Sequence, residues 1–398
     1  MECGYLRLMN AGNDSICAFL HIKCSELVSC ANDNRACYRP DYLCVSHPRC
    51  QTAPLCYPVD KALQVVCPPM LPATTTLPPV VPDDGICESA TWNVTGVTVA
   101  GGNGAGSELN ELNGPLGLFV DDDAAVYVAD TWNDRIVKWV PGASIGSVVA
   151  GGNGEGNQNN QLDHVAKVVV AKNGTMFICD RGNSRVQRWF KNDEHGQTII
   201  ANISCLGLAM DNEGSLYVCD GERQHVIKWP SNDIVAGKNG ERPEINQLLE
   251  PVHIFVDQDK SVIVADFQSA RVMKWPVGAK EGIVVAGGNG EGDAANQLNG
   301  MKYSTIMLIV RLLSVVVDQM GTVYVLDTDN HRVMRWFKDS KSGSVIIGGR
   351  GWGNEIDQLS FPEDLTFDRQ GNLYVVDNDN HRIQMFAIDK SSCAKTTH

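Results

Sequence analysis

The sequence predicts an all-β fold, a six-bladed β-propeller preceded by a small disulfide-rich module. Three observations lead to this prediction. One unit recurs six times along the chain, glycine accounts for 38 of the 398 residues, and ten of the 14 cysteines lie within the first 87 residues. Abundant glycine indicates many tight turns between short strands.

The cysteine-rich segment, residues 1–67, is predicted to be a disulfide framework. Zinc modules hold their metal with close pairs of cysteines. The tightest spacing here leaves five residues between two cysteines, as between Cys24 and Cys30. Disulfides are therefore favoured over zinc, and they indicate an oxidising compartment.

Residues 68–86 form the predicted linker. Six prolines and three threonines favour a stiff, extended segment, either a plain spacer or an O-glycosylated stalk. The first residues lack the apolar run of a signal peptide. Because the cysteines indicate secretion, we expect a signal peptide or membrane anchor to have preceded Met1.

The propeller is expected over residues 87–394, where a strand–turn–strand unit recurs. Its copies are YVADTWNDRIVKW (127–139), FICDRGNSRVQRW (177–189), YVCDGERQHVIKW (217–229), IVADFQSARVMKW (263–275), YVLDTDNHRVMRW (324–336) and YVVDNDNHRIQMF (374–386). The intervals between their aspartates are 50, 40, 46, 61 and 50 residues. Such a period suits four short strands and their turns, the content of one blade.

The outer strands predict how the ring closes. The strand VTVA (97–100) precedes the first unit, and nothing similar follows the last one. If residues 97–100 join the last blade, every blade has four strands and no sheet edge stays open. This closure brings Cys87 and Cys393 to the same blade edge, so we expect a disulfide between them.

The unit Y-V-x-D-x-x-N-x-R-[VI]-x-x-W, followed by V-x-A-G-G-x-G, resembles the NHL repeat, most closely at 330–332 and 380–382. The resemblance covers residues 94–390 and implies a six-bladed propeller. The layout also resembles secreted or membrane-tethered NHL proteins with a cysteine-rich N-terminal region. The third unit departs from the pattern because it lacks the glycine loop, and the fifth has a surplus of 11 residues within 301–313. We interpret the surplus as a tolerated bulge or a mistranslated segment, with a functional insertion as the alternative.

Residues that recur in every unit are expected to be structural. The tryptophans should pack between blades, and the aspartates should pair with the arginines that end each turn. The glycine loops do not open a predicted helix, so we interpret them as turns between blades and not as phosphate loops. Cys179, Cys205 and Cys219 lie in the second and third units. Cys179 and Cys219 occupy the repeat position of Ala129 and Ala265, so we expect them to be buried small hydrophobic side chains.

The resemblance also raises the question of a metal. Six-bladed propellers include calcium-dependent hydrolases and lactonases, and the amidating lyase is an NHL-type enzyme with zinc. Their ligands come from inner strands, where this chain carries His164, His253, Glu363 and Asp364. Two other blades offer only Leu116, Gly117, Leu206 and Gly207 there. We therefore expect no cofactor, and calcium or zinc in the central channel is the alternative.

Charge and sequons bear on function. The net charge is −14, and residues 88–398 hold 27 basic and 39 acidic residues, which argues against nucleic-acid binding. The propeller contains N-glycosylation sequons at Asn93, Asn173 and Asn202. We expect an extracellular or cell-surface module that binds a protein, glycan or small ligand without catalysis, and meets a membrane only through a missing anchor. The alternatives are a metal-dependent propeller enzyme, either amidating-lyase-like or hydrolase- or lactonase-like, and an intracellular ubiquitin-ligase scaffold.

Overall fold

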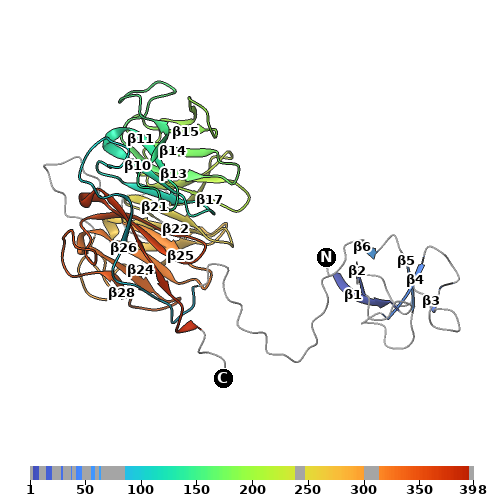
Figure 1. The fold of residues 1–398 in the computed structure, drawn as a ribbon. Helices are drawn as coiled ribbons and strands as arrows, with labels where there is room; N and C mark the ends of the chain where they lie inside the picture. Colours follow the sequence, from blue (N-terminus) through green and yellow to red (C-terminus); the bar gives the residue numbers. More distant parts are fainter. Residues whose placement is uncertain are drawn as a thin grey trace. The chain divides into compact units, whose positions relative to one another are not determined.

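The computed structural model describes residues 86–237, 247–299 and 313–393, together with short strands and Cys37 between residues 3 and 63. The chain divides into two compact units, Met1–Pro78 and Pro79–His398 (Figure 1). The linker expected at residues 68–86 lies outside the described residues apart from Ile86, and so does the surplus segment apart from Leu313. None of the described helices is long and apolar enough to cross a membrane.

The first unit is a six-stranded sheet in the order β3-β5-β4-β1-β2-β6. Its strands are β1 (Cys3–Leu8), β2 (Ser15–Phe19), β3 (Val28–Ser29), β4 (Tyr42–Ser46), β5 (Leu55–Pro58) and β6 (Ala62–Leu63). A disulfide joins Cys37 to Cys56, with their Cα atoms 5.8 Å apart. The cysteine-rich segment therefore carries a disulfide, as expected from its composition.

The second unit is a ring of six four-stranded antiparallel sheets, the predicted six-bladed propeller (Figure 1). The innermost strands are β9 (Gly117–Val120), β13 (Val165–Val170), β17 (Cys205–Met210), β21 (Pro251–Val256), β25 (Ser314–Val317) and β29 (Pro362–Phe367). The second strands are β10 (Val126–Asp130), β14 (Met176–Asp180), β18 (Leu216–Asp220), β22 (Val262–Asp266), β26 (Val323–Asp327) and β30 (Leu373–Asp377). Every residue of these second strands is buried, because blades cover both of their faces.

Two further strands complete each blade. The third strands are β11 (Arg135–Trp139), β15 (Arg185–Trp189), β19 (His225–Trp229), β23 (Arg271–Trp275), β27 (Arg332–Trp336) and β31 (Arg382–Phe386). The outer strands are β12 (Ser147–Gly151), β16 (Gln197–Ala201), β20 (Asp233–Ala236), β24 (Ile283–Gly287), β28 (Ser344–Gly348) and, for blade 6, β8 (Val97–Gly101). Single 3-10 turns link the second and third strands of four blades: η3 (Thr131–Asn133), η4 (Phe267–Ser269), η5 (Thr328–Asn330) and η6 (Asn378–Asn380).

Ring closure follows the prediction. The strand β8 pairs with β31, so the start of the propeller completes its last blade. A two-stranded ribbon, β7 (Thr91–Trp92) with β32 (Ile388–Asp389), lies beside this junction, and a disulfide joins Cys87 to Cys393. Trp92 is buried there and packs on Tyr324 and Phe367 of blades 5 and 6.

The repeated aromatic residues pack between blades, as predicted. Four tryptophans, Trp139, Trp189, Trp275 and Trp336, are at most 2% exposed, and Phe386 is fully buried. Trp229 is partly buried. Burying a large aromatic side chain contributes about 1.5–3 kcal/mol, so these residues dominate the packing between neighbouring sheets.

Cys179 is buried, as expected, but it is bonded to Cys205 and is not a free thiol. These residues, on β14 of blade 2 and β17 of blade 3, form a disulfide with Cα atoms 5.5 Å apart. The sequence pattern placed each cysteine within its own blade but did not show that the two strands meet across the boundary. Cys219 is buried and free, and burial holds the pKa of its thiol well above the usual value.

Candidate functional site

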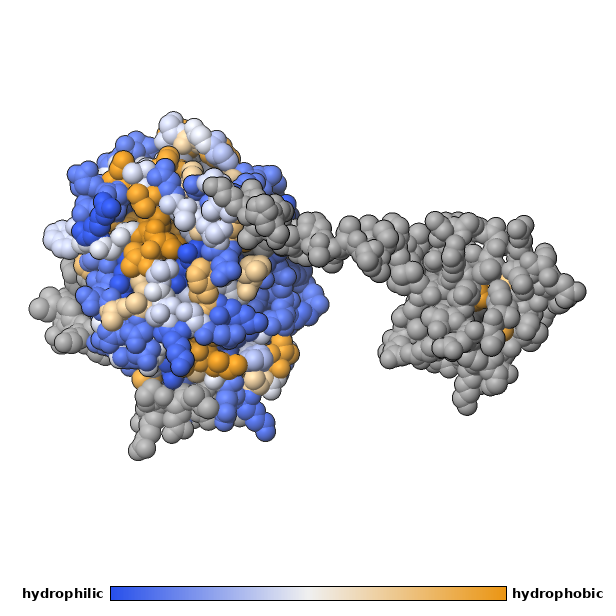
Figure 2. Space-filling model, turned by 90° about the horizontal axis from the view of Figure 1, so that it is seen from below, coloured by the Kyte–Doolittle hydropathy of each residue, from blue (hydrophilic) through white to orange (hydrophobic). Residues whose placement is uncertain are grey.

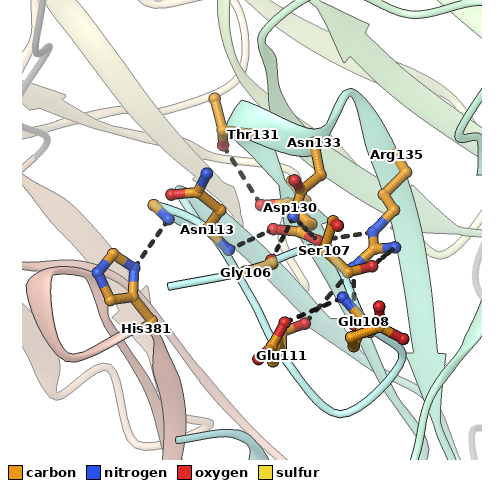
Figure 3. Close-up of polar contacts among 12 residues, drawn as sticks. Gly106, Ser107, Glu108, Glu111, Asn113, Asp130, Thr131, Asn133, Arg135 and His381 are labelled. Atoms are coloured by element: carbon orange, nitrogen blue, oxygen red, sulfur yellow. Dashed lines mark hydrogen bonds and ion pairs between the residues drawn. The ribbon is translucent and has the colours of Figure 1, made fainter. Parts of the chain in front are cut away.

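The aspartate that ends each second strand is the centre of a repeated polar network (Figure 3). In blade 1, Asp130 accepts hydrogen bonds from the Asn113 amide (2.7 Å), Asn133 (2.8 Å) and the Nε of Arg135 (2.7 Å). Arg135 then donates to the carbonyls of Ser107 (2.6 Å) and Glu108 (3.1 Å) in the preceding glycine loop. The same aspartate–arginine pair occurs in blades 2, 4, 5 and 6 at 2.6–2.9 Å. The predicted structural role of these residues is confirmed.

His164 and the turn histidines lie at the rim where second and third strands are joined. The His381 Nδ1 accepts the Gly114 amide (3.1 Å, Figure 3), and the His331 Nδ1 accepts the Phe361 amide (3.2 Å). At the corresponding junction between blades 1 and 2, Asp134 accepts the amide of His164 (2.8 Å). The side chain of His164 contacts Asp163 (2.5 Å) and Trp132 and is 37% exposed. Candidate ligand atoms of Asp134, Asp163 and His164 lie within 4.8 Å of one another.

A second polar cluster occupies the axis of the ring. Each inner strand contributes the residue that lies four positions before the start of its hairpin turn, as Gly117 lies four positions before Asp121. Around the ring this position holds Gly117, Lys167, Gly207, His253, Ser314 and Asp364. Gly117 is required because a Cβ there would lie 2.4 Å from the carbonyl oxygen of Ala166. The four side chains from blades 2, 4, 5 and 6 therefore share the centre of the channel.

Asp364 is the hub of this axial cluster. One carboxylate oxygen accepts the Leu118 amide of blade 1 (2.8 Å) and the ammonium of Lys167. The other oxygen accepts hydrogen bonds from the Ser314 hydroxyl (2.9 Å) and the Leu365 amide (2.9 Å). It also lies 3.2 Å from the His253 Nε2. Asp364 is 1% exposed. Burial alone would raise the pKa of its carboxyl, but Lys167 and His253 more than offset this and hold the pKa well below its usual range.

The contacts of His253 define its tautomer. Its Nδ1 accepts the Val315 amide (3.3 Å), so the proton of the neutral ring is on Nε2, which faces Asp364. The Lys167 ammonium lies 3.1 Å from the same Nε2. Burial and this ammonium lower the pKa of His253, while Asp364 opposes the shift. The imidazole is therefore neutral at pH 7.

This donor set does not fit a divalent cation. The Lys167 ammonium contacts both the carboxylate and the imidazole that a metal would need, and so acts as the cation of the site. Of the four candidate ligands, only His253 and Asp364 meet in this cluster. Glu363 is 1% exposed at a position where the other inner strands carry apolar residues, and His164 contacts the rim residues described above.

A cavity opens on the hairpin face, the face that carries the turns between first and second strands. Its volume is 240 Å³, and it is bordered by blades 1, 4, 5 and 6. Apolar walls come from Val120, Phe255, Val316, Val317 and Phe367, and the polar lining from Asp121, Asp122, Thr366, Asp368 and Arg369. Sequence reasoning missed this site, because its residues are neighbours only in the closed ring.

Apolar side chains also occur elsewhere on the propeller surface (Figure 2). Trp352 and Val277 are 72% and 70% exposed. Scattered apolar residues are normal on protein surfaces, so a concave site with polar groups is the stronger candidate. The sequon residues Asn93, Asn173 and Asn202 are all exposed.

Comparisons with known proteins agree with this architecture. Residues 311–335 and 359–386 match the family model described as the NHL repeat. The chain thus carries NHL repeats, and its six sheets close into one ring, a six-bladed β-propeller. No curated protein matches the sequence.

Several solved structures share the fold. An auxiliary nutrient binding protein from Bacteroides thetaiotaomicron is 12% identical with a TM-score of 0.56, over 75% of this chain and 77% of that one. One from Bacteroides ovatus is 14% identical with a TM-score of 0.52, over 75% and 73%. A putative phosphatase from Bacteroides thetaiotaomicron is 15% identical with a TM-score of 0.54, over 75% and 79%. At these identities the likeness shows the fold alone.

Proposed function

We propose that this chain is an extracellular binding protein that holds a small ligand at the hairpin face of its propeller and performs no covalent chemistry. The observation that carries the proposal is the 240 Å³ cavity at the mouth of the channel, half of whose lining residues are apolar and half polar or charged. Ligand sites in proteins combine apolar walls with placed polar groups, and the mouth of a ring of strands is a frequent place for them.

The axial cluster supports binding over catalysis. A catalytic acid, base or nucleophile must be within reach of a substrate. Here Asp364 accepts five donors from the protein, and the residues of the cluster are at most 7% exposed. The polar groups at the axis are thus engaged with one another, and none of the four lines the cavity, whose walls a ligand meets instead.

The disulfides and sequons support an extracellular location. Three disulfides, Cys37–Cys56, Cys87–Cys393 and Cys179–Cys205, are present among the described residues. Several disulfides in one chain are typical of proteins in oxidising compartments. The three exposed sequons are accessible to glycosylation.

A fragment screen on the purified chain tests ligand binding. We expect ligand-observed NMR to find fragments that bind the wild type and a Thr198→Trp control on the exposed strand β16, but not Thr366→Trp, whose indole fills the cavity. Melting temperatures of both variants report whether the fold is intact. Fragments that bind Thr366→Trp as well as the wild type would contradict the proposed site.

Surface biotinylation tests the compartment in cells that express the gene from its own transcript. We expect the chain in the medium or the surface fraction, with a mass that falls on removal of N-linked glycans. Recovery from the cytosol alone, with reduced cysteines, would contradict the proposal and favour an intracellular scaffold.

A further inference from the structure

The hairpin aspartates of three blades are paired with a lysine from the third strand. Lys138 lies 3.4 Å from Asp121 in blade 1, Lys228 lies 3.3 Å from Asp211 in blade 3, and Lys274 lies 2.9 Å from Asp257 in blade 4. The registers are equivalent, since Lys138 pairs with Tyr127 of β10, Lys228 with Tyr217 of β18 and Lys274 with Ile263 of β22. A cation at this position is therefore a regular feature of the repeat.

Blade 6 has no such lysine. The residue at this register is Met385, which pairs with Tyr374 of β30. Among the described residues, Asp368 accepts hydrogen bonds only from neutral donors: the amides of Gln370 (2.9 Å) and Asn372 (2.9 Å), the side chain of Asn372 (2.8 Å) and the Tyr374 hydroxyl (3.3 Å). Burial and the Asp368 carboxylate raise the pKa of Tyr374 to about 12, which fits an uncompensated negative charge beside it.

Asp368 lines the cavity, and the other charges of the lining already have counter-ions. Asp121 is paired with Lys138, and Asp122 lies 2.5 Å from Arg369. In the part of the chain that the structure describes, the Asp368 carboxylate thus has no cationic partner at the cavity wall. A carboxylate in a partly apolar site strongly favours a ligand that supplies the missing positive charge.

The walls define the rest of the ligand. Phe255, Val316 and Phe367 surround the space, and aromatic faces attract cations as well as apolar groups. A cavity of about 150 Å³ holds benzene, so 240 Å³ accommodates a single ring with a short chain. Trp92 stacks on Phe367 with ring centroids 5.8 Å apart and fixes this wall.

We propose that the cavity binds a small hydrophobic ammonium compound, with its ammonium group at Asp368 and its apolar body between Phe255 and Phe367. This inference rests on the proposed binding function and specifies the ligand class. The lysines of blades 1, 3 and 4 make the equivalent ammonium–carboxylate contact within their own blades.

The test compares 2-phenylethylammonium with its neutral isostere 2-phenylethanol and with phenylacetate, by calorimetry and ligand-observed NMR on the full chain. We expect the ammonium compound to bind about tenfold more tightly than the alcohol, because it gains a charge-assisted hydrogen bond, and phenylacetate to bind weakest. Met385→Lys should supply the cation internally and weaken ammonium binding by about tenfold, with binding of the alcohol unchanged. The control Met385→Gln should leave both affinities unchanged.

Three outcomes would overturn the inference: no binding of the ammonium compound, equal binding of the alcohol, or unchanged ammonium binding in Met385→Lys. Melting curves of Met385→Lys and Asp368→Asn separate a lost fold from a lost contact, and Asp368→Asn should also remove the preference for the ammonium. The proposed function fails separately, when the fragment screen finds no ligand that Thr366→Trp excludes. Fragments without positive charge that bind the cavity more tightly than amines would leave the function in place and refute the ligand class.

Discussion

Single buried charges hold the turns of the propeller. Burial raises the pKa of Asp327 even though Asn330, the Asn299 amide and Arg332 lower it, so desolvation is the larger effect at this carboxylate. Arg332 compensates this cost with one contact to the carboxylate at 2.8 Å and further contacts to loop carbonyls. Such a pair is a poor source of net stability but is costly to break, because the remaining charge stays buried.

Removal of one arginine should therefore destabilise the propeller strongly. We expect Arg332→Met to lower the free energy of unfolding by about 3–5 kcal/mol, measured by chemical denaturation. The matched control is Arg350→Met, which breaks a pair with Asp357 at 3.0 Å whose arginine side chain is 71% exposed. It should cost less than about 1 kcal/mol. Similar losses in both variants would show that burial of the pair is not what matters.

The axial histidine predicts a pH dependence of stability. Because burial and Lys167 lower the pKa of His253 in the folded chain, the unfolded chain takes up the proton at higher pH. Stability should be complete above the unfolded pKa of about 6.5 and fall as the pH drops through that value. His225, whose pKa burial also lowers, contributes in the same direction.

Melting temperatures between pH 7.5 and 5 measure this effect. We expect the wild type to lose stability over that range and His253→Gln to lose less, since one of the two histidines whose pKa is lowered is removed. In NMR titrations of the folded chain, the His253 ring should take up its proton only below the ordinary pKa of about 6.5. A ring that titrates near 6.5 in the native state would contradict the tautomer and the axial contacts described above.

At the scale of the element, blade 3 shows how one departure from the repeat is compensated by another. Its entry runs directly from β16 to β17 without the glycine loop whose carbonyls bind the arginine in the other blades. His225 stands at the arginine position, and Arg223 of the turn instead contacts Asp220 (2.6 Å) and donates to the carbonyl of Asn202 (2.8 Å). The disulfide between Cys179 and Cys205 joins blades 2 and 3 at this shortened junction.

Loss of that disulfide should loosen one junction of the ring. The two cysteines are 26 residues apart, which corresponds to about 3.5 kcal/mol in the chain-entropy model. We expect Cys179→Ala/Cys205→Ala to lower stability by up to this amount and to speed hydrogen exchange in β16 and β17. The control Cys219→Ala removes a buried free thiol and should leave exchange at the 2/3 junction unchanged. Uniform acceleration over all blades would contradict a local effect.

At the scale of the whole molecule, the ring is closed twice at one place. The strand β8 completes blade 6, and the Cys87–Cys393 disulfide fixes the ends of the chain beyond it. The axial cluster adds a third constraint, since Asp364 of blade 6 contacts side chains or amides of blades 1, 2, 4 and 5. Closure therefore depends on contacts between residues far apart in the sequence.

The disulfide of the chain ends should stabilise the closed ring. Its 306-residue separation corresponds to about 5–6 kcal/mol in the chain-entropy model. We expect Cys87→Ser/Cys393→Ser to lower the melting temperature and to increase hydrogen exchange first in β8 and β31. Peptide mapping without reduction should recover the cross-linked peptides of Cys87 and Cys393 from the wild type. Their absence, or exchange that is fastest elsewhere, would contradict the role of this disulfide.

The features that follow from local pattern could be predicted. The blades and the aspartate–arginine turns repeat in the sequence with a fixed phase, because each blade satisfies its own backbone hydrogen bonds. The joining of β8 to β31 follows from the same pattern, since the first outer strand has no blade of its own and the last blade lacks one. His253 and Asp364 were recognised as candidates from their strand positions. Lys167 and Ser314 were missed, although alignment of the position four residues before each hairpin turn would have placed them in the same ring.

The sequence by itself determined the six blades, their order and the module before them, since short-range alternation and turn residues specify strands wherever they occur. Only the tertiary structure decided that the axial cluster contains its own cation, that Cys179 pairs with Cys205, and that a cavity lies among four blades. The physical reason is distance along the chain: these contacts join residues from different blades, and closure of the ring alone brings them together. Met385 of blade 6 combines both kinds of information. The repeat in the sequence shows that it replaces a lysine, and the tertiary structure shows that the aspartate left without this lysine, Asp368, lines the cavity.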